Sequence, residues 1–138
     1  MRQLSEVIRG TVWDALTEMG DENPDSTLAN LTTPRHANQG DLALPCFALA
    51  KVMQKSPQDI AADLTQRVAT VLTAIDGCSE VSSDGGFCNF YVDAAWLAGQ
   101  TMEAILNNPD SVGHHRASSS LLIEHTSANP NGPFHVGR

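Results

Sequence analysis

A well-marked amphipathic helix over residues 56–72 limits the possible folds of this chain more than any other stretch. Ser56 stands before Pro57, and Asp59 follows three positions after the serine, which is the pattern of a capped helix N-terminus. Apolar side chains then recur at helical spacing, at Ile60, Leu64, Val68, Val71 and Leu72. Because such a helix must bury one face, the chain needs a second layer of structure to cover it.

A second helix is predicted near the N-terminus and closes at Gly20. Its apolar positions again follow helical spacing, at Leu4, Val7, Ile8, Val12, Ala15, Leu16 and Met19. The polar residues 21–26, which include Pro24, are expected to form a loop. Residues 27–33 alternate weakly and are expected to form a short strand.

Residues 78–92 predict a β-hairpin. Asp84, Gly85 and Gly86 stand between two short runs of strand-forming residues, and Asp-Gly supplies the positive φ that tight hairpin turns require. Asp93 then caps a predicted helix whose apolar side chains are Trp96, Leu97, Met102, Ile105 and Leu106.

A third apolar stretch, which runs from Asp41 to Met53, is interpreted as a helix with Asp41 as its cap and Pro45 in its first turn. The predicted fold class is therefore α/β (α+β), with a small antiparallel sheet packed with helices. A Pro-, Gly- and Ser-rich stretch at residues 107–120 is interpreted as a linker, and we expect a domain boundary near Ala117.

Charge and cysteine content restrict the functional classes. Eight Lys and Arg residues stand against 16 Asp and Glu, giving a net charge of -8, and the cations are scattered, which argues against non-specific nucleic-acid binding. With no long apolar run and no signal-peptide pattern, a cytoplasmic protein without a membrane partner is expected. Cys46, Cys78 and Cys88 form no C-x-x-C pair, which favours buried reduced thiols over disulfides or a zinc site.

Three segments in order carry a family resemblance: "GDLALPCFALAK", "GGFCNFYVDAAWLA" and "EHTSANPNGPFHVGR". Together they resemble the N-terminal region of class I arginyl-tRNA synthetases. The resemblance implies an added N-terminal tRNA-recognition domain over residues 1–116. Residues 117–138 would then be the start of a truncated, Rossmann-like catalytic domain, comprising its first strand and turn.

The last segment is similar to the first signature of that family, usually written HIGH, here read as residues 135–138. The resemblance implies catalytic roles for His135, Gly137 and Arg138. A Gly-containing turn between a strand and a helix N-terminus also offers free N–H groups and a positive dipole end, which suit a triphosphate.

The same resemblance implies that Glu124, Ser127 and Asn129 bind the substrate arginine. The residues themselves leave another interpretation open. Asn129 can be a turn residue, Glu124 a solvated carboxylate and His135 a loop histidine.

The hairpin is the second candidate site. The resemblance implies that Asp84, Phe87 and Asn89 grip a base of the tRNA D-loop, with an aromatic ring for stacking and polar groups for contacts to the base edge. Loop bases can be read in this way without a basic patch. The alternative is that Phe87, Phe90 and Tyr91 are ordinary strand residues that alternate between core and surface.

The family implies an arginine–tRNA ligase whose partners are tRNA(Arg), arginine and ATP, with Mg²⁺ entering as MgATP and no protein-bound metal. The isolated chain is expected to be inactive, because the second signature of the family, of KMSKS type, is absent from it. We expect a monomer, or association through the unpaired strand at Leu121, Leu122 and Ile123. Rival interpretations are a stand-alone, non-catalytic RNA-binding or protein-interaction module, and a fragment without function.

Overall fold

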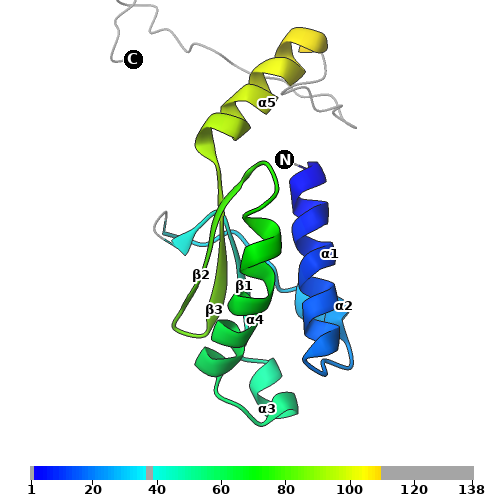
Figure 1. Cartoon of the computed structure of the whole chain (residues 1–138), viewed down its shortest axis with the longest axis vertical. Helices are drawn as coiled ribbons and strands as arrows, with labels where there is room; N and C mark the ends of the chain where they lie inside the picture. Colours follow the sequence, from blue (N-terminus) through cyan, green and yellow to red (C-terminus); the bar gives the residue numbers. More distant parts are fainter. Residues whose placement is uncertain (1, 37–38, 110–138) are drawn as a thin grey trace, which may run out of the picture.

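The computed structural model describes residues 2–36 and 39–109, and the chain forms five helices and three strands there (Figure 1). The strands make one antiparallel sheet with the order β1-β3-β2. The elements are α1 (Arg2–Glu18), α2 (Pro24–Leu28), β1 (Leu42–Pro45), α3 (Leu49–Met53), α4 (Pro57–Leu72), β2 (Cys78–Asp84), β3 (Phe87–Val92) and α5 (Ala94–Asn107).

Helix α4 covers one face of the sheet, and α1 packs against α4 on the same side (Figure 1). The core lies between them, and its fully buried side chains are Ile8, Val12, Leu16, Leu44, Cys46, Ile60, Leu64, Val68, Leu72, Cys88 and Phe90. The predicted class, a small antiparallel sheet packed with helices, is confirmed.

The predicted cap of α4 is also confirmed. The Asp59 amide donates to Ser56 Oγ at 3.1 Å, and Ser56 Oγ donates to Asp59 Oδ2 at 2.6 Å. One apolar position of this helix was assigned wrongly, since Val71 is 53% exposed. It lies at the edge of the apolar stripe, beside the buried Val68 and Leu72.

The helix predicted from Asp41 is wrong over residues 42–45, which form strand β1 instead. Asp41 does not cap a helix, because its Oδ2 accepts the Val92 amide of β3 at 2.8 Å. The Asp41 amide in turn donates to the Phe90 carbonyl at 2.9 Å. Pairing with β3 makes residues 42–45 a strand. Of the predicted helix, only Leu49–Met53 is helical, as α3.

Residues 21–33 also differ from their prediction. Helix α2 forms within the expected loop, because Asn23 caps it at the Ser26 amide and the buried Asp21 accepts the hydroxyl of Thr27 at 2.6 Å. The expected strand is reduced to a single bridge, in which Thr32 and Ala43 exchange backbone hydrogen bonds.

The predicted hairpin is confirmed, with strands β2 and β3 paired around Asp84 and Phe87. Gly85 and Gly86 connect the strands, with φ of +54° and +90°. Positive φ at both central residues is the requirement of a type I′ turn, whose twist matches that of the strands.

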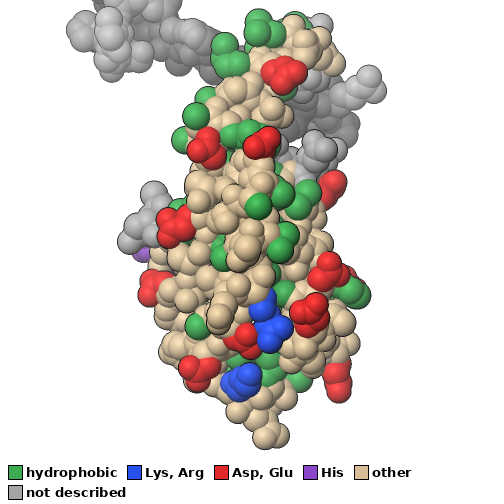
Figure 2. Space-filling model, in the orientation of Figure 1, with side chains coloured by type: hydrophobic (Ala, Val, Ile, Leu, Met, Phe, Trp, Pro, Cys, Tyr) green, Lys and Arg blue, Asp and Glu red, His purple; other side chains and the backbone are tan. Residues whose placement is uncertain are grey.

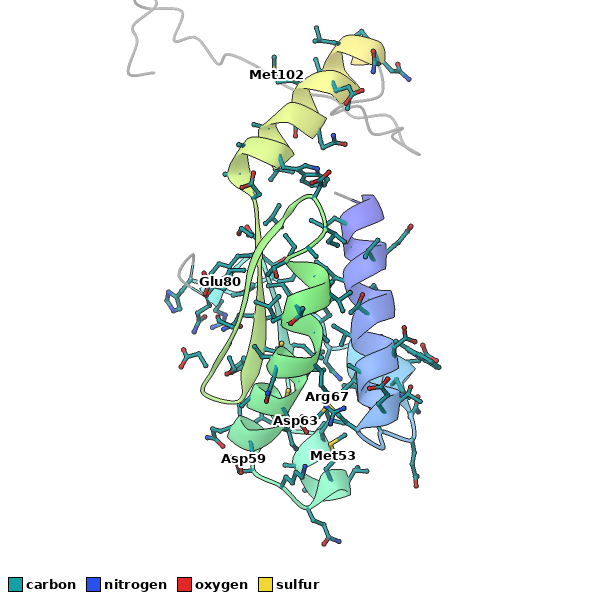
Figure 3. All side chains as sticks on the ribbon, in the orientation of Figure 1. Met53, Asp59, Asp63, Arg67, Glu80 and Met102 are labelled. Atoms are coloured by element: carbon teal, nitrogen blue, oxygen red, sulfur yellow. The ribbon has the colours of Figure 1, made fainter. Side chains whose placement is uncertain are left out.

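Helix α5 begins as predicted, since Asp93 Oδ1 accepts the Trp96 amide at 2.6 Å. Beyond Trp96 the helix extends away from the sheet and buries no residue (Figures 1 and 2). Met102 points into solvent (Figure 3) and is 57% exposed. Within the described residues, no helix has the length and hydrophobicity needed to span a membrane.

Candidate functional site

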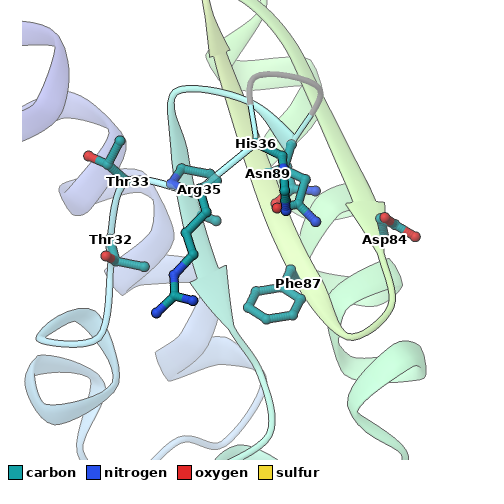
Figure 4. A pocket seen from close by; sticks show the side chains of 10 residues that line it. Thr32, Thr33, Arg35, His36, Asp84, Phe87 and Asn89 are labelled. Carbon is teal, nitrogen blue, oxygen red and sulfur yellow. The ribbon is translucent and has the colours of Figure 1, made fainter.

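The face of the sheet opposite α4 holds a pocket of about 330 Å³ (Figure 4). Strand alternation produces this face, because side chains directly opposite each other in an antiparallel pair point to the same side. Asn89 of β3 lies opposite Ala43 of β1, and Phe87 lies opposite Asp84 of β2. The pocket lining is Thr32, Thr33, Pro34, Arg35, His36, Gln39, Ala43, Asp84, Phe87 and Asn89.

The three hairpin residues predicted to bind RNA, Asp84, Phe87 and Asn89, therefore lie together at one pocket. Figure 4 shows the Phe87 ring in the middle of the group, with Asp84 to one side of it. The arrangement agrees with the sequence prediction, whereas the role in RNA binding stays a prediction.

The Phe87 ring is held by a second aromatic side chain. Its centroid lies 5.1 Å from that of Phe47, at an interplanar angle of 78°, which is a favourable edge-to-face geometry. A Cβ on Gly86 would lie 3.0 Å from Pro57 and 3.2 Å from Phe47, which is a tight fit, and the φ of +90° there favours glycine. The Phe87 ring is thus fixed in place but remains partly exposed toward the pocket.

Asn89 is the buried polar group of the site. Its residue exposure is only 2%, and within the described residues its Oδ1 has no hydrogen-bond partner. Buried polar atoms are almost always paired, and leaving one unpaired costs about 1–3 kcal/mol. An unpaired acceptor at a pocket wall is suited to receive a hydrogen bond from a ligand.

Sequence reasoning missed the other wall of the pocket. Arg35, His36 and Gln39 come from the segment before β1, about fifty residues away from the hairpin in the sequence. A helix at residues 42–45 would have placed them elsewhere. Recognising that stretch as a strand partner of β3 was the signal that would have found them.

Gly40 and Asp41 hold this segment against the sheet. Gly40 has φ of +85°, and a Cβ there would lie 2.7 Å from the Phe90 carbonyl oxygen. Close backbone approach therefore requires glycine at this point. Gly40 and Asp41 thus connect the segment before β1 to β3, the strand that carries Phe87 and Asn89.

The cysteines do not contribute a reactive group. All three are free and buried, as predicted. Burial raises the pKa of the Cys46 thiol to about 11 and that of Cys88 to about 12. Because the thiolate is the nucleophile, these thiols are inert near neutral pH. Within the described residues, no group of three or more His, Cys, Asp or Glu side chains lies together as a metal site requires.

The predicted catalytic residues His135, Gly137 and Arg138 lie outside the described residues. The same holds for the predicted arginine-binding residues Glu124, Ser127 and Asn129, and for the boundary near Ala117.

Comparisons with known proteins show the family of the chain. A family model described as the arginyl tRNA synthetase N terminal domain matches residues 6–92. The arginine–tRNA ligase of Archaeoglobus fulgidus is 34% identical over 138 residues, which are 99% of this chain and 22% of that protein. The Methanocaldococcus jannaschii ligase is 39% identical over 93 residues, which are 67% of this chain and 16% of that protein.

Among solved structures, the arginyl-tRNA synthetase of Thermus thermophilus is similar with a TM-score of 0.55 and 29% sequence identity. The match covers 70% of this chain and 15% of that chain. This chain thus spans about a fifth of the length of the curated relatives that it matches. By sequence and by fold, the chain belongs to the family of the arginyl-tRNA synthetase N-terminal domain.

Proposed function

We propose that this chain is the N-terminal, tRNA-binding part of an arginine–tRNA ligase, and that its pocket takes one base from the D-loop of tRNA(Arg). The observation that carries the proposal is the unpaired, buried Oδ1 of Asn89 beside the partly exposed ring of Phe87. The first group is an acceptor for a base edge, and the second is a surface for stacking.

The size and chemistry of the pocket suit a single unstacked base. Its volume of about 330 Å³ is at the small end of ligand pockets. The face of the base would lie on Phe87, and an exocyclic amino group would donate to Asn89 Oδ1. This chemistry favours bases with such a group, adenine, cytosine or guanine, over uracil, which has none. Asp84 accepts hydrogen bonds only, so it would receive a sugar hydroxyl or a second amino hydrogen.

The acidic character of the chain is compatible with this kind of binding. Reading a base that projects from a folded loop depends on stacking and edge contacts, and needs only a few phosphate contacts. With a net charge of -8, affinity for RNA in general should be low, so the folded tRNA must present the base at the pocket.

The proposal extends to the residues that lie outside the described part of the chain. We propose a domain boundary near Ala117, with residues 117–138 belonging to the catalytic domain. There Glu124, Ser127 and Asn129 would bind arginine. His135, Gly137 and Arg138 would contact ATP, which enters with Mg²⁺ as a substrate. The whole enzyme would act in the cytoplasm, and the chain would be a monomer.

Arginine activation is not expected from these 138 residues alone, since they span about a fifth of the curated relatives' length. Arginine-dependent pyrophosphate exchange, measured with and without tRNA, tests this. Exchange clearly above a buffer control would show that the 138 residues contain a complete catalytic site.

The test of base binding uses the full chain and a tRNA(Arg) transcript. Phe87→Ala removes the stacking surface and should weaken binding by about 1–3 kcal/mol, the usual contribution of one stacked base. Trp13→Ala is the matched control, because Trp13 is an aromatic residue of α1 that is 39% exposed and does not line the pocket. Equal affinities for the two variants would contradict the proposal. A transcript with its D-loop bases replaced by uracil should bind the wild type more weakly than the natural transcript, because uracil has no exocyclic amino group to donate to Asn89 Oδ1.

A further inference from the structure

The cationic side chains of the described residues are used in different ways. Arg67 binds Asp63 at 2.8 Å (Figure 3) and Glu18 at 3.5 Å. Lys55 lies 3.8 Å from Asp63. These charges are neutralised locally, and the pair of Arg67 and Glu18 joins α4 to α1. Arg35 has no such partner among the described residues, and it alone of the lysines and arginines lines the pocket.

The pocket is electrostatically asymmetric. Figure 4 shows Arg35 on one side of the Phe87 ring and Asp84 on the other, and His36 and Asn89 also line the pocket. A phosphate is repelled from the Asp84 side and attracted to the Arg35 side. On a chain with a net charge of -8, a local cation of this kind decides where an anion can be held.

The segment that carries Arg35 is tied to the sheet at both ends. Before it, Thr32 and Ala43 exchange backbone hydrogen bonds of 3.0 and 2.8 Å. After it, the Gln39 amide donates to the His36 carbonyl at 3.0 Å, and Asp41 is bonded to β3. Arg35 is therefore positioned relative to Phe87 by the sheet itself. A guanidinium also matches a phosphate with two parallel N–H groups.

We propose that Arg35 binds the phosphate next to the base that occupies the pocket, so that the site holds a whole nucleotide in one orientation. The phosphate lies at Arg35, the base stacks on Phe87, and the base edge faces Asn89. This inference rests on the proposed function, because it assigns a second contact of the same nucleotide.

The experiment measures tRNA(Arg) affinity over a range of KCl concentrations for the full chain and four variants. Arg35→Ala should weaken binding about tenfold at low salt, as expected for a hydrogen bond between charged groups. It should also reduce the slope of log affinity against log salt by about one, the signature of one lost phosphate contact. Arg35→Lys should keep the slope and recover part of the affinity, since a charge remains without the bidentate geometry.

Two further variants separate this inference from the proposed function. Arg9→Ala removes an exposed arginine of α1 that does not line the pocket, and it should leave the slope unchanged. Phe87→Ala should weaken binding without changing the slope, because no phosphate contact is lost. Circular dichroism of each variant checks that the fold is retained.

The outcomes are distinct. Equal effects of Arg35→Ala and Arg9→Ala would overturn the phosphate contact while the Phe87 result still supports base binding. If Arg35→Ala lowers both the affinity and the salt slope while Phe87→Ala has no effect, the phosphate contact is supported and the stacked base is refuted. Unchanged affinity in both variants would refute both proposals.

Discussion

Phe87 and Phe90 belong to the same strand, β3, but lie on opposite faces of the sheet. Phe90 faces α4, is completely buried and belongs to the core. Phe87 faces the pocket, is only partly buried and contacts Phe47. The same residue type thus fills the core on one face and lines a pocket, partly exposed, on the other.

The difference extends to the residues between them. Cys88 lies on the covered face, and its Sγ accepts a hydrogen bond from the Thr65 hydroxyl of α4 at 3.2 Å. Asn89, on the open face, is equally buried but leaves its Oδ1 unpaired. On the covered face the Cys88 group is paired within the domain, whereas on the open face a buried acceptor is left unpaired. Under the proposed function, strand alternation separates stability from binding, so substitutions on the two faces should have different effects.

The largest effect is expected from Phe90→Ala. Removing a fully buried phenylalanine should lower the free energy of unfolding by about 3–5 kcal/mol, whereas Phe87→Ala should lower it by roughly 1 kcal/mol or less. Urea denaturation followed by circular dichroism measures both. A similar loss for the two variants would mean that Phe87 belongs to the core as well, and the contrast between the faces would be wrong.

The next effect separates binding from stability at a single residue. Asn89→Leu removes the unpaired acceptor, so the free energy of unfolding should stay unchanged or rise by up to about 1 kcal/mol. Affinity for tRNA(Arg) should fall by about 1–3 kcal/mol, the cost of a lost edge contact. Ser82→Ala on the neighbouring strand is the control, since Ser82 lies opposite Asn89 but does not line the pocket. A strongly destabilised Asn89→Leu would mean that the amide has a structural role.

A pH effect tests the covered face. The ordinary thiol pKa of 9.0 is raised by burial to about 11 in Cys46 and to about 12 in Cys88. Above pH 9 the unfolded chain loses these protons first, so stability is complete below pH 9 and falls as the pH rises toward the folded pKa values. Each thiol should contribute a loss of about 1.4 kcal/mol per pH unit.

Urea denaturation at pH 8 and pH 10 measures this loss. In Cys88→Ala the difference between the two pH values should shrink by about 1.4 kcal/mol, and Cys46→Ala should behave in the same way. An unchanged difference in both variants would show that these thiols are not protected from ionisation by the core.

The smallest effect is expected in α5, which neither face of the sheet covers. Leu106 is 76% exposed, so Leu106→Ala should change the free energy of unfolding by less than about 0.5 kcal/mol. Thermal denaturation of the full chain checks this. A larger loss would mean that α5 is covered by another part of the chain, and its apolar surface would then belong to a second core.

Local sequence was sufficient where a complete signal lay within a few residues. Ser56, Pro57 and Asp59 mark the start of α4, and the capping bonds form as expected. Gly85 and Gly86 define the hairpin turn for the same reason, because positive φ at two successive residues is a local requirement.

The secondary structure of short apolar stretches could not be predicted from local sequence. Leu42–Pro45 fits a helix or a strand equally well by periodicity, and pairing with β3, more than forty residues away, makes it a strand. The prediction for residues 27–33 was wrong in the opposite direction. A strand was expected there, but only Thr32 forms a β-bridge. Secondary structure in such stretches depends on tertiary pairing, which a local pattern does not contain.

The sequence by itself determined the two long helices, the hairpin and the free, buried cysteines, and its resemblance to the family singled out the hairpin residues Asp84, Phe87 and Asn89, whose role in RNA binding stays a prediction. Only the tertiary structure decided that the segment of Arg35 and His36 lies beside Phe87 and Asn89. It also decided that Asn89 Oδ1 is buried without a partner. Both follow from the pairing of β1 with β3, because the order of strands in a sheet is set by contacts between residues distant in the sequence.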